Sequence, residues 1–219
     1  MKVYTNQLKK VLSPQEQKLF SSLNTANKIQ DYLDGLPINF EAGGDTLYSP
    51  RQVIIEQKAH CLEGALFAAT ALAFHGQKPL LLDLQTLPYD EDHVVTLFRE
   101  RGHWGAISKT NHAILRWRDP VYTSPRELAM SFFHEYYLSD GIKTLRAFSK
   151  PFDLTRYAPE VWVTAEKNLE DIAVDLDDSP HTPILLPGVS RKNLRKTSGV
   201  ERRMLDFVEW ESEKKRLFK

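Results

Sequence analysis

Apolar residues in the first third of the chain recur at helical spacing, between clear start and stop signals. The string SPQE at 13–16 is typical of a helix N-terminus, with a capping serine, a proline at the first helical position and a reciprocating glutamate. Thr25 begins a second predicted helix, which Gly35 ends, and the dipeptide SP at 49–50 begins a third. The segment 41–50, which contains Gly, Asp and Pro, predicts a loop.

From 61 to 74 the apolar positions surround the whole helix instead of forming one face. Leucine and alanine occupy the positions at helical spacing, and the opposite face adds Ala68 and Ala71. A helix that is apolar all round is buried on several sides. We therefore predict a central helix that begins at Cys61 and ends at the pair His75-Gly76.

The pattern then changes to runs of β-formers separated by turns. Segment 78–86 predicts a short strand, 92–108 a hairpin around Arg-Glu-Arg-Gly, and 111–122 a further strand. Segment 124–138 has another Ser-Pro-x-Glu start and predicts a helix, and we assign the aromatic residues of this region to the core. Helices followed by an antiparallel sheet favour the α+β class.

The signals weaken after residue 141. Segments 145–154 and 160–165 suggest two short strands, and 177–199 looks irregular because of its prolines and glycines. Ser198 can cap a last amphipathic helix whose expected inward residues are Val200, Met204, Leu205 and Val208. We expect one domain over 1–219, with a helical part at 1–76, a sheet-rich part at 77–165 and an irregular and helical extension at 166–219.

Composition and charge narrow the class of protein. The 219 residues include 29 Lys or Arg and 29 Asp or Glu, so the bulk charge indicates no polyanionic partner. The single cysteine excludes an internal disulfide and fits a reducing compartment. The N-terminal residues lack the apolar core of a signal peptide, and no apolar run approaches the ~20 residues that cross a bilayer. We therefore expect a cytoplasmic protein without a membrane partner.

Cys61 is the main candidate for chemistry, although two interpretations compete. At a helix N-terminus the dipole and the free backbone N–H groups favour the thiolate and can receive an oxyanion. Free cysteine is also among the most buried residue types, so a core role fits equally well. A nucleophilic cysteine needs a base, and His93 at the start of the predicted hairpin can lie over the helix start.

This order of segments resembles the transglutaminase-like superfamily, whose core is a papain-like fold. The matching residues are Cys61 in AHCLEGALFAATALAFHG, His93 in DHVVTLF and Trp104 in GHWGAIS, and the resemblance covers 46–108. It implies a papain-like α+β fold, with N-terminal helices and a buried Cys-bearing helix packed on an antiparallel sheet. It also implies a third catalytic residue at the end of the strand that follows His93.

The third position departs from the superfamily pattern, which usually has Asp there. This chain has Ser108, which can accept a hydrogen bond from an imidazole but carries no charge. Asn111 and Asp119 are the alternatives, and of the three we assign Ser108 to the position. The implied chemistry is acyl transfer by the Cys61 thiolate to water or an amine, on a protein or peptide substrate and without a cofactor. The Cys61 amide, and more weakly Gln57, are candidate oxyanion donors.

Three other interpretations remain. Four histidines could be zinc ligands, His60, His93, His103 and His112. Their spacing matches no metal motif, so we predict no metal site. The basic segment 190–204 can contact phosphates, although charge runs more often face water, and we do not favour a nucleic-acid partner. The main rival to the enzyme is a catalytically degenerate domain of the same fold that binds a protein.

Overall fold

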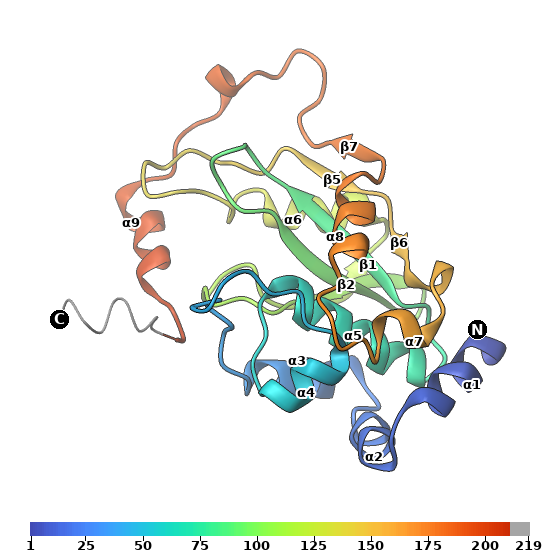
Figure 1. The fold of residues 1–219 in the computed structure, drawn as a ribbon. Coiled ribbons are helices and arrows are strands. Elements are labelled where there is room, and N and C mark those ends of the chain that lie inside the picture. Colours follow the sequence, from blue (N-terminus) through green and yellow to red (C-terminus); the bar gives the residue numbers. More distant parts are fainter. Residues whose placement is uncertain (211–219) are drawn as a thin grey trace.

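The structure is a computed structural model that describes residues 1–210. It is an α+β protein in which helices pack on an open antiparallel sheet (Figure 1). The sheet has the strand order β4-β3-β2-β1-β5-β7, and β6 also pairs with β1. The strands are β1 (Leu80–Gln85), β2 (His93–Glu100), β3 (His103–Ile107), β4 (Arg118–Tyr122), β5 (Ala147–Ser149), β6 (Phe152–Asp153) and β7 (His181–Pro183).

The N-terminal helices form at the predicted start signals. They are α1 (Lys2–Val11), α2 (Pro14–Ser22), α3 (Ala26–Asp34), α4 (Pro50–Glu56) and α5 (Cys61–Phe74). Ser13 and Ser49 each form a capping box, and Thr25 accepts from the Lys28 amide. The central helix α5 has the predicted bounds, and every residue from Leu62 to Phe74 is buried.

The two faces of the sheet bury two separate cores. The first core contains α5, the N-terminal helices and the inward strand residues Leu81, Val94, Phe98 and Ile107. The second contains α6 (Pro125–Phe132) and the alternate residues Leu82, Leu84, Val95, Leu97 and Ala106. Alternating strand residues therefore serve opposite layers, so both faces are covered. The Thr96 hydroxyl donates to the Ala65 carbonyl at 2.6 Å and fixes α5 on β2.

The predicted hairpin is present, and its turn explains its register. Strands β2 and β3 join through Arg101 and Gly102, both of which have positive φ angles, 48° and 85°. Two positive φ values match the twist of the flanking strands and favour glycine at the second position. This turn sets Thr96 opposite Ile107, and it therefore places His93 and Ser108 at the same end of the hairpin.

Several local expectations were wrong. Segment 160–165 is not a strand, because Pro159 begins the short helix α7 (Pro159–Trp162). Buried Trp162 donates its indole N–H to the Tyr4 hydroxyl at 2.9 Å, so packing on α1 overrides the β-propensity of the segment. Residues 111–117 form a loop before β4, and Leu115 there has a φ of 66°, which interrupts a strand.

The C-terminal extension contains more structure than expected but buries less. It holds α8 (Glu170–Asp177), η2 (Arg191–Asn193), α9 (Gly199–Arg202) and η3 (Arg203–Asp206), and the short η1 (Leu154–Arg156) precedes it. Ser198 caps α9 as predicted, but neither α9 nor η3 buries a residue, and Val200 is 66% exposed. The expected inward face of a last amphipathic helix is therefore wrong. Figure 1 shows this segment (red) taking a long path to α9, at the side of the sheet away from α1.

Among residues 1–210, no helix is long and apolar enough to cross a membrane.

Candidate functional site

Cys61 is the first residue of α5, and the residues around it hold the helix start. His60 is the N-cap, and its Nδ1 accepts from the Leu62 amide at 3.2 Å. The Glu63 carboxylate in turn accepts from the His60 amide at 2.9 Å, which completes a capping box. Because the amide of a first helical residue has no partner inside the helix, the Cys61 N–H is an available donor at the thiol.

Glu63 is fully buried and ties the loop 39–48 to this helix start. Its carboxylate accepts from the Asn39 amide group at 3.1 Å, the Thr46 hydroxyl at 2.8 Å and the Tyr48 amide at 3.0 Å. A buried carboxylate is tolerated where such donors replace its water. Thr46 also contacts His60, whose Nε2 lies 2.9 Å from the Thr46 carbonyl. The loop and the cap therefore fix the orientation of His60.

His93 and Ser108 meet across the β2–β3 hairpin. The Nε2 atom of buried His93 lies 2.7 Å from the Ser108 hydroxyl oxygen, and that hydroxyl donates to the Leu115 carbonyl at 2.8 Å. A hydroxyl has one proton, so Ser108 must accept from His93 Nε2–H. Neutral His93 therefore carries its proton on Nε2 and leaves Nδ1 as the basic nitrogen, free to face the thiol.

Helix α3 holds Ser108 in place. The side-chain amide of buried Gln30 accepts from the Ser108 N–H and donates to the Ser108 carbonyl, both at 2.9 Å. The next residue, Lys109, is buried and donates to the carbonyls of Leu33 and Leu36 at the end of the same helix. Burial lowers the pKa of Lys109 to about 8.

Gly64 allows the Cys-bearing helix to approach this strand end. A Cβ atom at Gly64 would lie 2.4 Å from the Lys109 Cβ, closer than any real contact of two carbons. Glycine is thus required where α5 crosses the chain at Lys109, one residue after Ser108. The close crossing brings the first turn of α5 next to the partner of His93.

The electrostatic environment favours a thiolate at Cys61. Burial raises the pKa of the thiol, but hydrogen bonds from His60 and His93, together with their charges, lower it to about 5. Cys61 nevertheless stays partly exposed at the cleft. The thiol is therefore ionised at neutral pH and open to a reagent.

His60 responds to the same charge. Burial lowers the pKa of its imidazole, but the hydrogen bond and charge of Cys61 and the charge of Glu63 raise it to about 9. In the observed arrangement Nδ1 accepts from the Leu62 amide and so carries no proton. Protonation needs Nδ1 to become a donor toward the thiolate, at the expense of the Leu62 bond.

The site opens into a cleft of about 590 Å³. Its walls include apolar side chains from four parts of the chain, Ile38, Phe40, Ile114, Leu115, Tyr136, Tyr137, Leu138 and Leu205. Acidic residues Glu41, Asp90, Glu91, Asp92 and Glu135 also line it. The Tyr136 hydroxyl donates to the Glu91 carbonyl, which joins the α6 side of the cleft to the β1–β2 loop.

The alternatives for the third position lie elsewhere. Asn111 pairs through its side chain with the backbone of Trp210, and exposed Asp119 accepts from the Trp117 indole at 2.8 Å. Of the three candidates, Ser108 is the one placed against His93. The suggested oxyanion donor Gln57 is exposed and donates to the Ile54 carbonyl of its own helix at 2.6 Å, outside the residues that line the cleft. Across residues 1–210 no cluster of His, Cys, Asp and Glu is placed to bind a metal.

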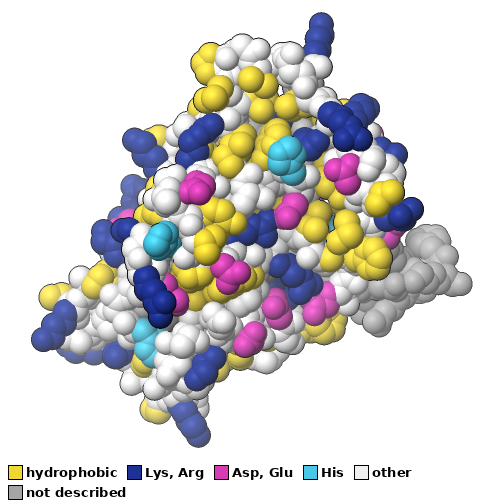
Figure 2. All heavy atoms as spheres, turned by 180° about the vertical axis from the view of Figure 1, so that it is seen from behind, with side chains coloured by type: hydrophobic (Ala, Val, Ile, Leu, Met, Phe, Trp, Pro, Cys, Tyr) yellow, Lys and Arg dark blue, Asp and Glu magenta, His cyan; other side chains and the backbone are white. Residues whose placement is uncertain are grey.

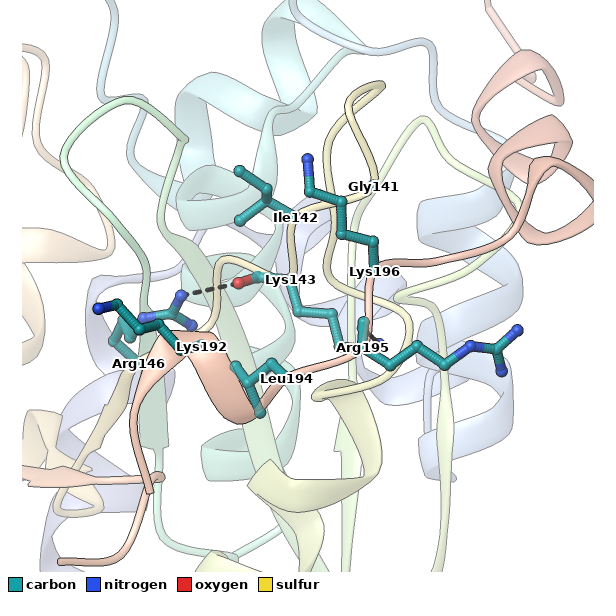
Figure 3. Close-up of a pocket in the computed structure, with 8 residues that line it drawn as sticks. All are labelled: Gly141, Ile142, Lys143, Arg146, Lys192, Leu194, Arg195 and Lys196. Atoms are coloured by element: carbon teal, nitrogen blue, oxygen red, sulfur yellow. Dashed lines mark hydrogen bonds between the residues drawn. The ribbon is translucent and has the colours of Figure 1, made fainter. Parts of the chain in front are cut away.

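The basic segment forms a separate hollow of about 270 Å³ (Figure 3). Lys143, Arg146, Lys192, Arg195 and Lys196 line it with Ile142 and Leu194. In Figure 3 Arg146 and Lys192 lie at one side, whereas the Arg195 guanidinium points away from them, and Arg146 is bonded to the Lys143 carbonyl at 2.8 Å. These cations spread over the hollow instead of converging. Figure 2, which is turned by 180° from the view of Figure 1, shows side chains of both charges among apolar patches.

Sequence reasoning missed three residues of this site. From sequence, His60 is considered only for a zinc site, Glu63 has no predicted role, and Gln30 is predicted only as part of a helix. The spacing of His60 and Glu63 is that of a capping box with histidine as the cap, so this pair had a local signal. Gln30 had none, because its contact with Ser108 spans 78 residues.

No family model matches the sequence, and no curated protein is significantly similar to it.

Proposed function

We propose that this protein is a cysteine-dependent acyl-transfer enzyme of the papain-like, transglutaminase-like type. In this proposal Cys61 is the nucleophile, His93 the general base and acid, and Ser108 the residue that orients His93. The observation that carries the proposal is that Cys61 and His93 line one cleft and hydrogen-bond through their side chains, while buried Ser108 places its Oγ 2.7 Å from His93 Nε2.

The reaction would proceed through a thioester. The thiol proton already resides on Nδ1 of His93, and the Cys61 thiolate attacks the carbonyl carbon of an amide or ester. The Cys61 N–H stabilises the oxygen that becomes negative. His93 then returns the proton to the leaving amine or alcohol as its bond to the acyl carbon breaks. Water or an amine attacks the thioester, gives its proton to His93 and releases the thiolate.

Ser108 suits this cycle in one respect and differs from the superfamily in another. By accepting from Nε2–H it holds the tautomer in which Nδ1 is basic, which is one of the functions of a triad carboxylate. Its hydroxyl supplies no negative charge to the imidazolium. His60 supports the proposal here, since a second imidazole beside the thiol favours the thiolate.

The first test is acyl transfer from p-nitrophenyl acetate, followed by mass spectrometry of the intact chain and of the peptide that contains Cys61. We expect one acetyl group on Cys61 and a burst of nitrophenolate. His93→Ala should slow the burst by about 100-fold or more, the usual contribution of general acid–base catalysis. Ser108→Ala should slow it less, whereas Ser139→Ala, an exposed serine at the same cleft, should leave it unchanged.

Two results would contradict the proposal. One is acetylation confined to lysines, and the other is a burst that is equally fast in His93→Ala. Either result would favour a catalytically degenerate domain that uses this cleft to bind a protein.

A further inference from the structure

Residues 207–210 pair with the loop 111–113 at the rim of the Cys61 cleft. The Ala113 amide donates to the Phe207 carbonyl, and the Glu209 amide donates to the Asn111 carbonyl, both at 3.1 Å. His112 and Val208 form the antiparallel bridge between these two bonds. The loop therefore accepts a short extended segment as a neighbouring strand, although these residues lie almost 100 positions apart in the sequence.

The Asn111 side chain adds a second pair of bonds to this segment. Its amide nitrogen donates to the Trp210 carbonyl at 2.9 Å, and its amide oxygen accepts from the Trp210 N–H at 2.8 Å. Both partners are backbone atoms of one residue, so Asn111 recognises the main chain and not a particular side chain. Arg116 supplies one side-chain contact, an ion pair with Glu209 at 2.5 Å.

Little apolar burial holds this segment in place. The preceding α9 and η3 bury no residue, and Phe207 is 61% exposed. The attachment therefore depends on a few hydrogen bonds from the backbone and from Asn111, one partly exposed ion pair, and the half-buried side chains of Val208 and Trp210. Segments held in this way open with a small free-energy cost compared with a packed helix.

The same segment reaches the proposed active site. Leu205 lines the cleft together with Cys61, and Asn111 and His112 are also part of its wall. The loop 111–113 therefore belongs in part to the wall of the cleft that contains Cys61, and residues 207–210 of the same chain occupy its pairing atoms.

We propose that the edge formed by Asn111, Ala113 and Arg116 is a binding site for an extended polypeptide segment with an acidic residue, and that residues 207–210 fill it until such a segment replaces them. The backbone contacts require an extended chain, and Arg116 favours a carboxylate at the position that Glu209 now occupies. The peptide site stands on its own geometry. That its occupant enters the cleft for reaction at Cys61 rests on the proposed function.

The test uses the full chain and a fluorescein-labelled synthetic peptide of residues 203–210. Glu209→Pro removes both the Glu209 N–H and the ion pair with Arg116, and it should empty the edge. Fluorescence anisotropy should then show about tenfold tighter binding of the peptide than to wild type, because a competing internal segment reduces apparent affinity by the fraction of open protein. Asn111→Ala in the Glu209→Pro protein should abolish this gain.

Matched controls separate this effect from altered folding. Glu209→Gln keeps the backbone amide, so the affinity of this variant for the labelled peptide should stay closer to that of wild type. In wild type, the Ala113 and Glu209 amides should exchange with deuterium faster than the amides of β2. Three results would overturn the proposal. The peptide affinity could be equal in wild type and Glu209→Pro, or it could be unchanged by Asn111→Ala. The Ala113 amide could also be protected from exchange as strongly as the amides of β2.

The binding measurements are made in a Cys61→Ser background. Their outcome therefore does not depend on acyl transfer. Peptide binding without acetylation of the wild-type thiol would reject the proposed reaction alone, and acetylation without peptide binding would reject this site alone.

Discussion

Ser108 determines which nitrogen of His93 is basic. Its hydroxyl proton goes to the Leu115 carbonyl, so it can only accept from the imidazole. A carboxylate at this place would hold the same tautomer and would also attract the imidazolium charge. The thiol instead receives extra stabilisation from His60, so the charge in this site is shared by one thiolate and two imidazoles.

The pH dependence of Cys61 alkylation tests whether the two imidazoles stabilise the thiolate in this way. The pKa of the folded thiol, about 5, lies below the ~8.5 of a free cysteine, so the thiolate persists down to about pH 5. The rate of reaction with iodoacetamide should be nearly flat from pH 6 to 8 and fall as pH drops through about 5. His93→Ala should move this midpoint upward.

His181→Ala is the matched control, since His181 pairs with Asp83 and not with the thiol. Its alkylation profile should overlay that of wild type. A wild-type profile that rises up to pH ~8.5 would show an ordinary thiol and contradict the electrostatic description of the site.

At the scale of elements, the close crossing of α5 over Lys109 positions Cys61 relative to His93. Gly64 faces the Lys109 side chain, and Lys109 itself is tied to the end of α3. Three elements therefore meet within one turn of Cys61. The crossing leaves no room for a side chain at Gly64, so a small backbone shift there would displace the thiol from His93.

Gly64→Ala should consequently disturb both stability and reactivity. The added methyl would lie 2.4 Å from the Lys109 Cβ, and relief of that overlap requires a backbone shift. Such overpacking costs about 1–3 kcal/mol of unfolding free energy, measurable by urea denaturation. The alkylation rate of Cys61 at pH 7 should change as well.

Gly43→Ala is the comparison, because nothing lies within 4 Å of a Cβ added at Gly43. It should leave stability and reactivity close to wild type. A Gly64→Ala protein as stable and reactive as Gly43→Ala would show that the crossing is not tight.

At the scale of the whole molecule, polar links join helices that lie far apart in the sequence. Glu16 accepts from the Arg51 guanidinium at 2.7 and 2.9 Å and from the Ser13 amide at 2.7 Å, so it connects α2 with α4. Burial raises the pKa of Glu16, but these hydrogen bonds outweigh it and lower the pKa below its usual value.

Glu16→Gln should therefore destabilise the protein in a pH-dependent manner. A carboxyl whose folded pKa is lowered contributes stability above its unfolded pKa of ~4.3, and this contribution is lost as pH falls through the lower folded pKa. We expect a loss of about 1–3 kcal/mol at pH 7, as for a hydrogen bond to a charged group, and a smaller difference near pH 3.

Urea denaturation at the two pH values measures this difference. Exposed Glu56, changed to Gln, should have little effect at either pH. A Glu16→Gln loss that stays constant down to pH 3 would assign the effect to packing instead of charge.

The sequence predicted the parts of the fold that depend on local rules. The caps at Ser13, Thr25 and Ser49, the bounds of α5 and the β2–β3 hairpin all follow from residues a few positions apart. Segment 160–165 was predicted incorrectly, because its conformation depends on a distant partner, Tyr4. The site likewise contains contacts between residues that are distant in the sequence.

Residue types and spacing identified Cys61 and His93 as candidates, and the superfamily resemblance added Ser108. Their catalytic roles stay predictions. The contact of Gln30 with Ser108 and the pairing of Asn111 with Trp210 had no sequence signal, because each joins segments about 80 to 100 positions apart. Only the folded chain brings such residues together.

The bond between Tyr4 and Trp162 has a consequence for synthesis of the chain on the ribosome. The two residues are 158 positions apart. At ~5–20 residues per second, translation from one to the other takes roughly 8–30 s. For that interval the buried face of α1 lacks its last partner, so α1 is among the last helices to finish packing. Nascent-chain chaperones therefore meet α1, an amphipathic helix, before its docking site is complete.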